Sequence, residues 1–297
     1  EDQGPLAHPV RPESFQEINN FYTATVYEKG AEVIGMLKLL VGDEAYSKAL
    51  DLYFDRHDGQ ACTIEDWLQV FEDTTGRDLA QFKRWYSQAG TPLLSVTESW
   101  DHGTLTLHFK QHTPASDATT DPQPHVLPIA VGLIGQDGDE VEETTVLEMT
   151  QAEQSFVFDG LGTRPVASVL RGFSAPVVLT QDLSDADRAH LLAHDTDPFN
   201  RWEQGRMLAY GSLLGMIREG KAPNKDWLAG IRAVIGDETL DPAYRALMLG
   251  LPSQSDLARA LSEAGDTPDP DIIYAATEAT RATMAEAFAD LLPTLYR

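Results

Sequence analysis

The stretch AGTPLLSV, residues 89–96, marks the point at which the periodicity of the sequence changes. Gly90 is typical of a helix end, and Pro92 lacks the N–H that a continuing helix needs. Before this stretch the apolar residues recur at helical spacing, and after it they alternate as in β-strands. The chain is therefore expected to pass here from a helical segment into a β domain.

Upstream, from about residue 21 to residue 90, the apolar runs predict a series of helices. Thr63, three residues before Asp66, is typical of a helix N-cap. Glycine follows each run and is expected to end it, because glycine accepts the left-handed conformation common after a helix. The predicted ends are Gly42, Gly59, Gly76 and Gly90.

Downstream, short runs rich in β-branched and aromatic residues are separated by turn-rich sequence. Their length and spacing predict an antiparallel, Ig-like β-sandwich of roughly 85 residues. Pro128 is expected on an edge strand or at a bulge, because proline cannot donate to a sheet ladder. The expected strands span 104–109, 126–134, 143–149, 154–159 and 165–170.

After SAPVVLTQDLS the helical period returns and continues to Arg297. Ser184 and Ser253 are candidate N-caps, and short amphipathic helices joined by loops are typical of an α-solenoid. The fold class is therefore multi-domain α and β. We expect a helical domain over 1–91, a β-sandwich over 92–180 and the first helices of a solenoid-like domain over 181–297.

Composition excludes several classes of function. The formal charge of −25 repels phosphate backbones and anionic lipid, so nucleic acid is not an expected partner. No apolar run approaches the roughly 18 residues of a membrane-spanning helix. Cys62 is the single cysteine, which excludes an internal disulfide and a cysteine metal cluster.

The histidines form two pairs at four-residue spacing. His190 and His194 in HLLAH have the spacing of the zinc motif H-E-x-x-H, but Leu191 stands where the general base would be, which favours two ordinary surface histidines over a metal site. His108 and His112 lie in strand-patterned sequence, where four residues span roughly 13 Å, too far for one zinc ion. This second pair is expected to be structural or to face solvent.

Three glycine-containing motifs favour structural interpretations. GSLLG (211–215) lies in helical sequence and has its serine one place early for a nucleophile elbow. GLG (160–162) follows a strand but is not completed to a dinucleotide-binding loop, so a turn is expected. DGDE (137–140) has two possible interpretations, a hairpin turn or a weak calcium loop, and the spacing favours the turn.

TATVYEKGAE, residues 23–32, places a tyrosine where a helix is expected to begin. Thr25 and Glu28 have the T-x-x-E spacing of a capping box, which would put Tyr27 in the first turn, beside the positive end of the helix dipole. Val33, Ile34 and Leu37 are expected to form the buried stripe behind it. The pattern alone leaves two roles open for Tyr27, a structural ring or a group that meets an anionic ligand.

Several segments together resemble the zinc aminopeptidase N family, in particular its bacterial alanyl aminopeptidase branch. The tyrosine of VYEKG and the pattern W-x-x-Q-x-G-x-P at 85–92 are the most specific markers, and the resemblance runs the length of the chain. The segments are NNFYTATVYEKGAEVIGML (19–37), YFDRHDG (53–59), RWYSQAGTP (84–92), AHPVRP (7–12), AEQSFVFDGL (152–161) and FSAPV (173–177).

This resemblance implies a role for each of three residues. Tyr27 matches the catalytic phenol that donates a hydrogen bond to the oxyanion formed when water attacks the scissile carbonyl; phenols stay protonated at neutral pH and so donate. Tyr22 matches a tyrosine that lines the pocket for the first side chain of the substrate. Asn19 matches a residue near the cleft.

The family's H-E-x-x-H motif, its third glutamate ligand and its G-x-M-E-N loop are not in this sequence. The resemblance therefore implies a zinc cofactor in the full-length enzyme, with ligands outside this chain, and no metal residues here. We expect the chain to be a fragment that lacks its N-terminal and catalytic segments and does not cleave peptides alone.

The resemblance also implies a cytoplasmic hydrolase that removes N-terminal residues from peptides, with no membrane partner. Residues 93–176 would be its β-sandwich spacer, and the helices from about residue 183 the beginning of its C-terminal domain. The alternative is a non-catalytic scaffold in which the sandwich and the helical array bind partners. A zinc site rebuilt from His190 and His194 ranks last.

Overall fold

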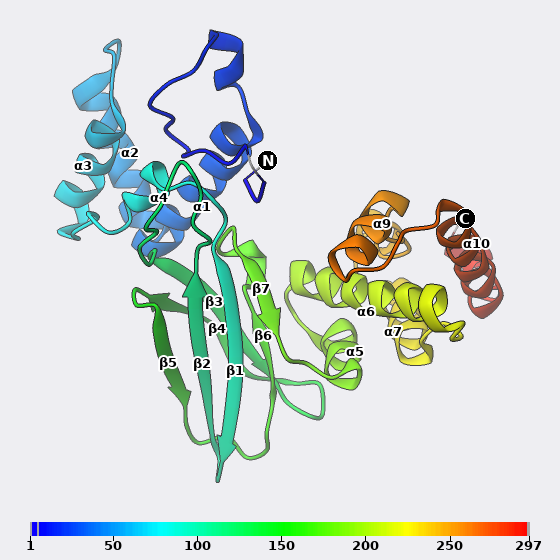
Figure 1. Ribbon diagram of the computed structural model, residues 1–297. Coiled ribbons are helices and arrows are strands. Elements are labelled where there is room, and N and C mark those ends of the chain that lie inside the picture. Colours follow the sequence, from blue (N-terminus) through cyan, green and yellow to red (C-terminus); the bar gives the residue numbers. More distant parts are fainter. Residues whose placement is uncertain (1, 5, 296–297) are drawn as a thin grey trace. The chain divides into compact units, whose positions relative to one another are not determined.

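A computed structural model describes residues 2–4 and 6–295. The chain divides into two compact units, each with its own core. The first comprises Glu1–Gly132, Glu143–Arg164 and Val169–Asp182, and the second comprises Leu133–Glu142, Pro165–Ser168 and Leu183–Arg297. Figure 1 shows the order of the elements along the chain.

The predicted helical segment is confirmed in the first unit. Thr63 caps α3 through a reciprocal pair with Asp66, and Gly42 and Gly76 are the C-caps of α1 and α3. All four glycines predicted as stops have positive φ. The last of these helices is a single short turn. The elements are η1 (Ile18–Phe21), η2 (Thr25–Lys29), α1 (Gly30–Val41), α2 (Asp43–His57), α3 (Ile64–Thr75) and α4 (Arg84–Ser87).

Helix α1 buries one stripe, but that stripe differs from the predicted one. Val33 and Leu37 are buried as expected, whereas Ile34 is 39% exposed, so its inclusion was wrong. Met36 takes its place, because residues three and four apart share a helix face and 33, 36 and 37 satisfy that spacing.

The β-sandwich is also confirmed, with two strands that the sequence pattern missed, β1 and β7. One sheet has the order β5-β2-β1-β7 and the other β4-β3-β6. β1 pairs antiparallel with β2 but parallel with β7, so the sandwich is not antiparallel throughout. The strands are β1 (Leu93–Asp101), β2 (Thr104–His112), β3 (Leu127–Ile134), β4 (Glu140–Met149), β5 (Glu153–Phe158), β6 (Val166–Val169) and β7 (Val178–Gln181), with a short 3-10 turn η3 (Arg171–Phe173) before β7.

Pro128 lies in β3, the central strand of the three-stranded sheet, so the prediction of an edge strand was wrong. It occupies the second position of the strand, at its very beginning, where proline is better tolerated than in the middle. Every residue of β3 is buried, which explains why the strand reads as a continuous apolar run rather than an alternation.

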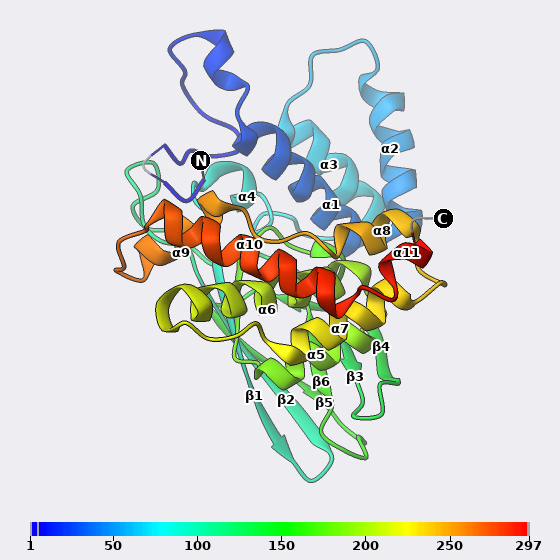
Figure 2. The same ribbon diagram turned by 90° about the vertical axis from the view of Figure 1, so that its right-hand side faces the viewer.

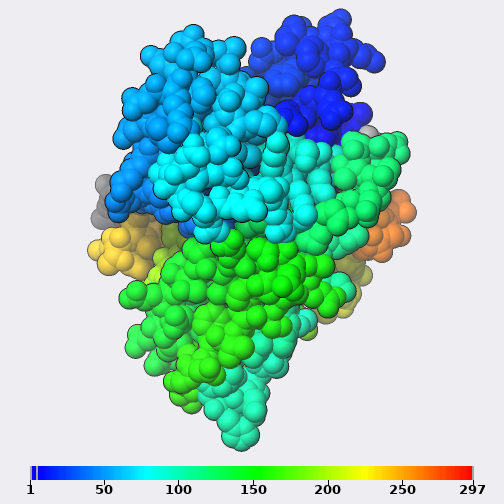
Figure 3. Space-filling model, turned by 90° about the vertical axis from the view of Figure 1, so that its left-hand side faces the viewer, coloured from blue at the N-terminus to red at the C-terminus, as the bar shows by residue number. Residues whose placement is uncertain are grey.

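In the first unit, the end of the helical segment packs directly against the β-sandwich. The Trp85 side chain is fully buried, and its Nε1–H donates to the Val126 carbonyl at 2.9 Å. Gln81 Nε2 donates to the Thr150 carbonyl at 2.7 Å, and Arg77 pairs with Glu148 at 2.6 Å. In Figure 3 the cyan segment, which holds α3 and α4, meets the green segment of the sandwich.

The second unit contains the predicted helical array (Figure 2). Ser184 and Ser253 cap α5 and α9 through their hydroxyl oxygens, as expected. α5 packs against α6 and α7, and α10 packs against α6 and α9. The helices are α5 (Asp185–His194), α6 (Pro198–Glu219), α7 (Lys225–Gly236), α8 (Pro242–Leu247), α9 (Gln254–Glu263), α10 (Pro270–Ala287) and α11 (Leu292–Leu295).

The glycine motifs take the structural forms that the sequence favours. GSLLG lies inside α6, and Gly160 of GLG has a positive φ in the turn after β5. The DGDE loop closes a hairpin between β3 and β4, in which Gly135 N–H donates to the Asp139 carbonyl at 2.7 Å. Over residues 2–4 and 6–295, no helix combines the length and apolarity that crossing a bilayer requires.

Candidate active site

Tyr27 lies in η2, a single π-helical turn that leads directly into α1. Its side chain is 56% exposed, although the residues around it, Thr25 and Lys29, are buried. The position at the mouth of a helix is thus confirmed. A π-turn inserts an extra residue into a helix and is found frequently at functional sites.

The cap of this helix is not the predicted one. Thr23 Oγ1 accepts the Val26 N–H at 3.2 Å, and the Thr23 carbonyl accepts the Tyr27 N–H at 3.0 Å. Thr25 lies inside the turn, and its hydroxyl is buried without a hydrogen-bond partner among the described residues. The capping box at Thr25 was therefore wrong: two threonines stand two places apart, and the helix begins at the earlier one.

The structure brings Tyr22 and Tyr27 together. Their ring centroids lie 5.9 Å apart, and Tyr22 is 59% exposed. Asn19 lies in η1, and its carbonyl accepts the Tyr22 N–H at 3.3 Å. This backbone bond is the connection that the structure shows between Asn19 and the tyrosine pair.

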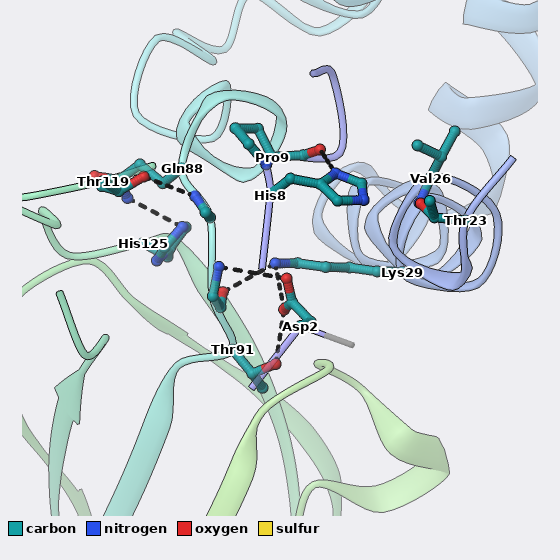
Figure 4. Close-up of polar contacts among 12 residues, drawn as sticks. Asp2, His8, Pro9, Thr23, Val26, Lys29, Gln88, Thr91, Thr119 and His125 are labelled. Atoms are coloured by element: carbon teal, nitrogen blue, oxygen red, sulfur yellow. Dashed lines mark hydrogen bonds and ion pairs between the residues drawn. The ribbon is translucent and has the colours of Figure 1, made fainter. Parts of the chain in front are cut away.

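Lys29, in the same turn as Tyr27, takes part in a polar cluster that the sequence pattern did not reveal. Lys29 Nζ donates to Asp2 Oδ2 and to the Gly90 carbonyl, both at 2.9 Å. Thr91 Oγ1 also donates to Asp2 Oδ2, at 2.7 Å (Figure 4). No local signal announces these contacts, because the partners are far apart in the sequence.

His125 is a buried neutral histidine in the same unit. Gln88 Nε2 donates to its Nε2 at 3.1 Å, and its ring lies 4.3 Å from that of Trp85 between centroids. Burial, together with the smaller effect of the positive charges of Lys29 and Arg84, lowers the pKa of His125 to about 3. The ring is therefore uncharged at neutral pH and acts as a hydrogen-bond acceptor.

A pocket of about 420 Å³ opens beside η2 and the beginning of α1. Its wall includes Asp2, Thr25, Glu28, Lys29 and Glu32. The positions on η2 and α1 recur at helical spacing, so they share one face of the helix. Tyr27 is not part of that wall, and its phenol belongs to a different face.

A second pocket, of about 400 Å³, lies within the helical unit. Trp202, Tyr210 and Trp227 contribute its aromatic wall. Arg206 lies over the rings of Trp202 and Tyr210, 5.4 Å and 5.3 Å from their centroids. Of the residues singled out in the sequence, Ser253 lines this pocket, and it is the N-cap of α9.

The two histidine pairs have structural surroundings. The rings of His190 and His194 lie 4.8 Å apart between centroids, and His190 Nε2 contacts the Gly135 carbonyl at 2.8 Å. Burial lowers the pKa of His194, and His190 and Arg201 add to this effect. His108 is exposed on β2 and hydrogen-bonds Ser99 and Ser155, as expected of a solvent-facing strand residue.

The part of the chain that the structure describes does not fit a zinc ion. It contains no group of three or more His, Cys, Asp or Glu side chains arranged to hold a metal. The histidine spacing at 190 and 194 is thus not completed by a third ligand within that part. The chemistry that the candidate site can supply is hydrogen bonding from the exposed phenols of Tyr22 and Tyr27.

Three family profiles match consecutive parts of the chain. Residues 1–86 match the peptidase family M1 domain. Residues 90–182 match a domain of unknown function, DUF3458, with an Ig-like fold, and residues 185–297 match its C-terminal companion, DUF3458_C, described as ARM repeats.

Named relatives cover the whole chain. It is 43% identical over 302 residues to aminopeptidase N of Caulobacter vibrioides and 40% identical over 310 residues to aminopeptidase N of Escherichia coli K12, with 100% of this chain aligned in both. The chain spans about a third of their length, 34% and 35%.

A solved structure supports the same relationship. The crystal structure of Legionella pneumophila aminopeptidase A in complex with aspartic acid matches 97% of this chain and 33% of that chain, with a TM-score of 0.84 and 28% identity. The matched profiles, the relatives aligned along the full chain and the shared fold agree with one another. The chain is similar along its whole length to about a third of aminopeptidase N, and its residues 1–86 match the M1 peptidase family.

Proposed function

We propose that this chain is the part of a zinc aminopeptidase that supplies the oxyanion-stabilising tyrosine, Tyr27. The observation that carries the proposal is the exposed phenol on a π-turn at the beginning of a helix, in a turn whose Thr25 and Lys29 are buried. An apolar core has no use for a hydroxyl held outward in this way. The substrates are peptides with a free N-terminus, and the reaction is hydrolysis of the first peptide bond.

In this proposal Tyr27 donates a hydrogen bond to the carbonyl oxygen as negative charge develops there. A donor held in place before the reaction stabilises the transition state more than the ground state, and one such donor typically contributes about 10²- to 10³-fold in rate. Tyr22, whose ring lies beside that of Tyr27, contacts the first side chain of the substrate. Asn19 lies at the edge of the same cleft.

The zinc ligands and the general base are proposed to lie in sequence outside this chain, since the described residues do not fit the ion. The partners are the remaining catalytic segments and the peptide substrate. The proposal divides the chain into three parts. The end of the catalytic domain spans 1–91, the sandwich spacer spans 92–180, and the first helices of the C-terminal domain span 181–297. We also propose a cytoplasmic location.

The test compares two proteins. The product of the complete reading frame and the chain of residues 1–297 are each supplied with zinc, and release of nitroaniline from alanine p-nitroanilide is followed. We expect turnover only from the complete product. Turnover by residues 1–297 alone would contradict the division of roles, and an inactive complete product would favour the non-catalytic scaffold.

A further inference from the structure

Lys29 is a buried cation in the same π-turn as Tyr27, two residues further along. Its side chain is only 8% exposed, and that of its partner Asp2 is 15% exposed. Lysine is almost never buried unless it is paired, since removing its charge from water is costly. A buried ion pair anchored in the turn that carries an exposed phenol is an arrangement that simple apolar packing would not produce.

The pair of Lys29 and Asp2 connects three separate segments of the chain through hydrogen bonds. Lys29 Nζ is 2.9 Å from both Asp2 Oδ2 and the Gly90 carbonyl oxygen, and it lies 5.8 Å from the centroid of the Trp85 ring. Asp2 in turn accepts the Gly90 N–H at 3.3 Å and the Thr91 hydroxyl at 2.7 Å. Figure 4 shows the Lys29 side chain reaching from its helix to Asp2.

The geometry links this pair to Tyr27 through the backbone. Lys29 is the last residue of the π-turn that contains Tyr27. A π-turn is a rare alternative to the α-helix and is confined to short stretches, so contacts from outside the helix decide whether it persists. Tyr27 and Lys29 share this one short turn, so a change in its register would redirect both side chains.

We propose that Lys29, paired with Asp2, is a positioning residue that holds the Tyr27 phenol in its catalytic direction. This inference rests on the proposed function, because it concerns the same site. Lys29 itself touches neither the substrate nor the reacting atoms. Loss of the ammonium relaxes the turn and misplaces the phenol, and a shift of about 1 Å in a catalytic group costs up to about 10²-fold in rate.

The test is a double-mutant cycle in the zinc-loaded product of the complete reading frame. Lys29→Met keeps the length of the side chain and removes its charge. We expect it to lower kcat by roughly 10- to 100-fold and to leave KM within about twofold. In a Tyr27→Phe background the same change has little further effect, because the hydroxyl that Lys29 positions is already absent.

Lys83→Met is the matched control, since Lys83 forms an exposed ion pair with Glu65 in the same unit. It is expected to leave kcat unchanged. Asp2→Asn removes the partner charge and should repeat the kcat loss, so it replaces Lys29→Met in the cycle if that variant does not fold. Failure of both variants to fold assigns the pair to stability alone and overturns the proposal.

The outcomes separate the two ideas. A Tyr27→Phe enzyme with full kcat overturns the proposed function, whatever Lys29 does. A Tyr27→Phe enzyme with reduced kcat, in which Lys29→Met lowers the rate by the same factor as in the wild-type background, keeps the proposed function and overturns the positioning role. Near-complete loss of the Lys29 effect in the Tyr27→Phe background supports both.

Discussion

The rings of Tyr22 and Tyr27 face each other across 5.9 Å between centroids, at an interplanar angle of 31°. Both rings are more than half exposed. Phe21 contacts Tyr22 edge-on at 6.2 Å, and Phe15 contacts Phe21 at 5.8 Å, so the pair ends a row of aromatic side chains. An aromatic row outside the core is characteristic of a surface that receives a ligand or another part of a protein.

Tyr27→Phe in the product of the complete reading frame is expected to lower kcat for alanine p-nitroanilide by about 10²- to 10³-fold. The ring and its contact with Tyr22 remain, so only the hydroxyl donor is lost. KM should change little, because the oxyanion forms after binding. Steady-state kinetics measure both constants, and a kcat within twofold of the wild type would remove Tyr27 from the reaction.

Tyr22→Ala is expected to raise KM by roughly tenfold for substrates with a large first side chain, since an aromatic contact contributes about 0.5–1.5 kcal/mol beyond burial. For an alanine substrate the rise should be smaller. Tyr22→Phe keeps the ring and serves as the control with near-normal KM. Equal KM values for Tyr22→Ala and the wild type across substrates of different size would place Tyr22 outside the substrate pocket.

Acid is expected to destabilise the fold through His125. Its folded pKa of about 3 lies below the ordinary value of 6.5, so the unfolded chain binds a proton more readily in that interval. The stabilisation is complete above pH 6.5 and is lost as pH falls towards 3, by up to about 1.4 kcal/mol per pH unit.

This pH effect can be measured by urea unfolding of residues 1–297 at pH 7.5 and pH 5.5. His125→Gln cannot take up the proton, so its loss of stability between the two pH values should be smaller by on the order of 1 kcal/mol. Identical losses in wild type and variant would show that another group carries the acid sensitivity.

Thr63→Ala is expected to lower the free energy of unfolding by about 1 kcal/mol. Thr63 Oγ1 accepts the Asp66 N–H at 3.2 Å, and alanine removes this acceptor but keeps the backbone N–H that donates to Asp66 Oδ2 at 2.9 Å. Thr63→Ser keeps the acceptor and should retain most of the stability. Thermal unfolding of the two variants beside the wild type provides the comparison.

Much of the fold follows from local chemistry that sequence patterns report well. Thr63, Ser184 and Ser253 cap helices because their hydroxyls reach backbone N–H groups three residues on, a relation contained in a few consecutive residues. The strand patterns likewise reveal β2, where alternate residues are buried.

The errors arose where distant sequence decides the outcome. β7 lies parallel to β1, a pairing that the short run at 178–181 does not announce. Pro128 entered a central strand because all of β3 is enclosed, which depends on the other sheet elements. The contact of Lys29 with Asp2 and Gly90 joins positions that only the folded chain brings together.

The candidate site divides in the same way. The exposure of Tyr27 follows from its place at a helix beginning, whereas the π-turn and the cap at Thr23 could not be read from TATVYEKGAE, which offers two threonines of similar chemistry. The roles of Tyr27, Tyr22 and Asn19 came from the family resemblance and stay predictions.

Trp85 gives the boundary near residue 90 a practical meaning. Its indole is fully enclosed and donates to the backbone just before β3, so a family border drawn in sequence crosses a continuous interior. Expressing the two sides of that border separately would expose the apolar surface of the sandwich that Trp85 covers, and would expose the Trp85 indole on the helical piece. Each half would be prone to stick to other molecules, and recombinant work on either should begin upstream of the tryptophan or include both.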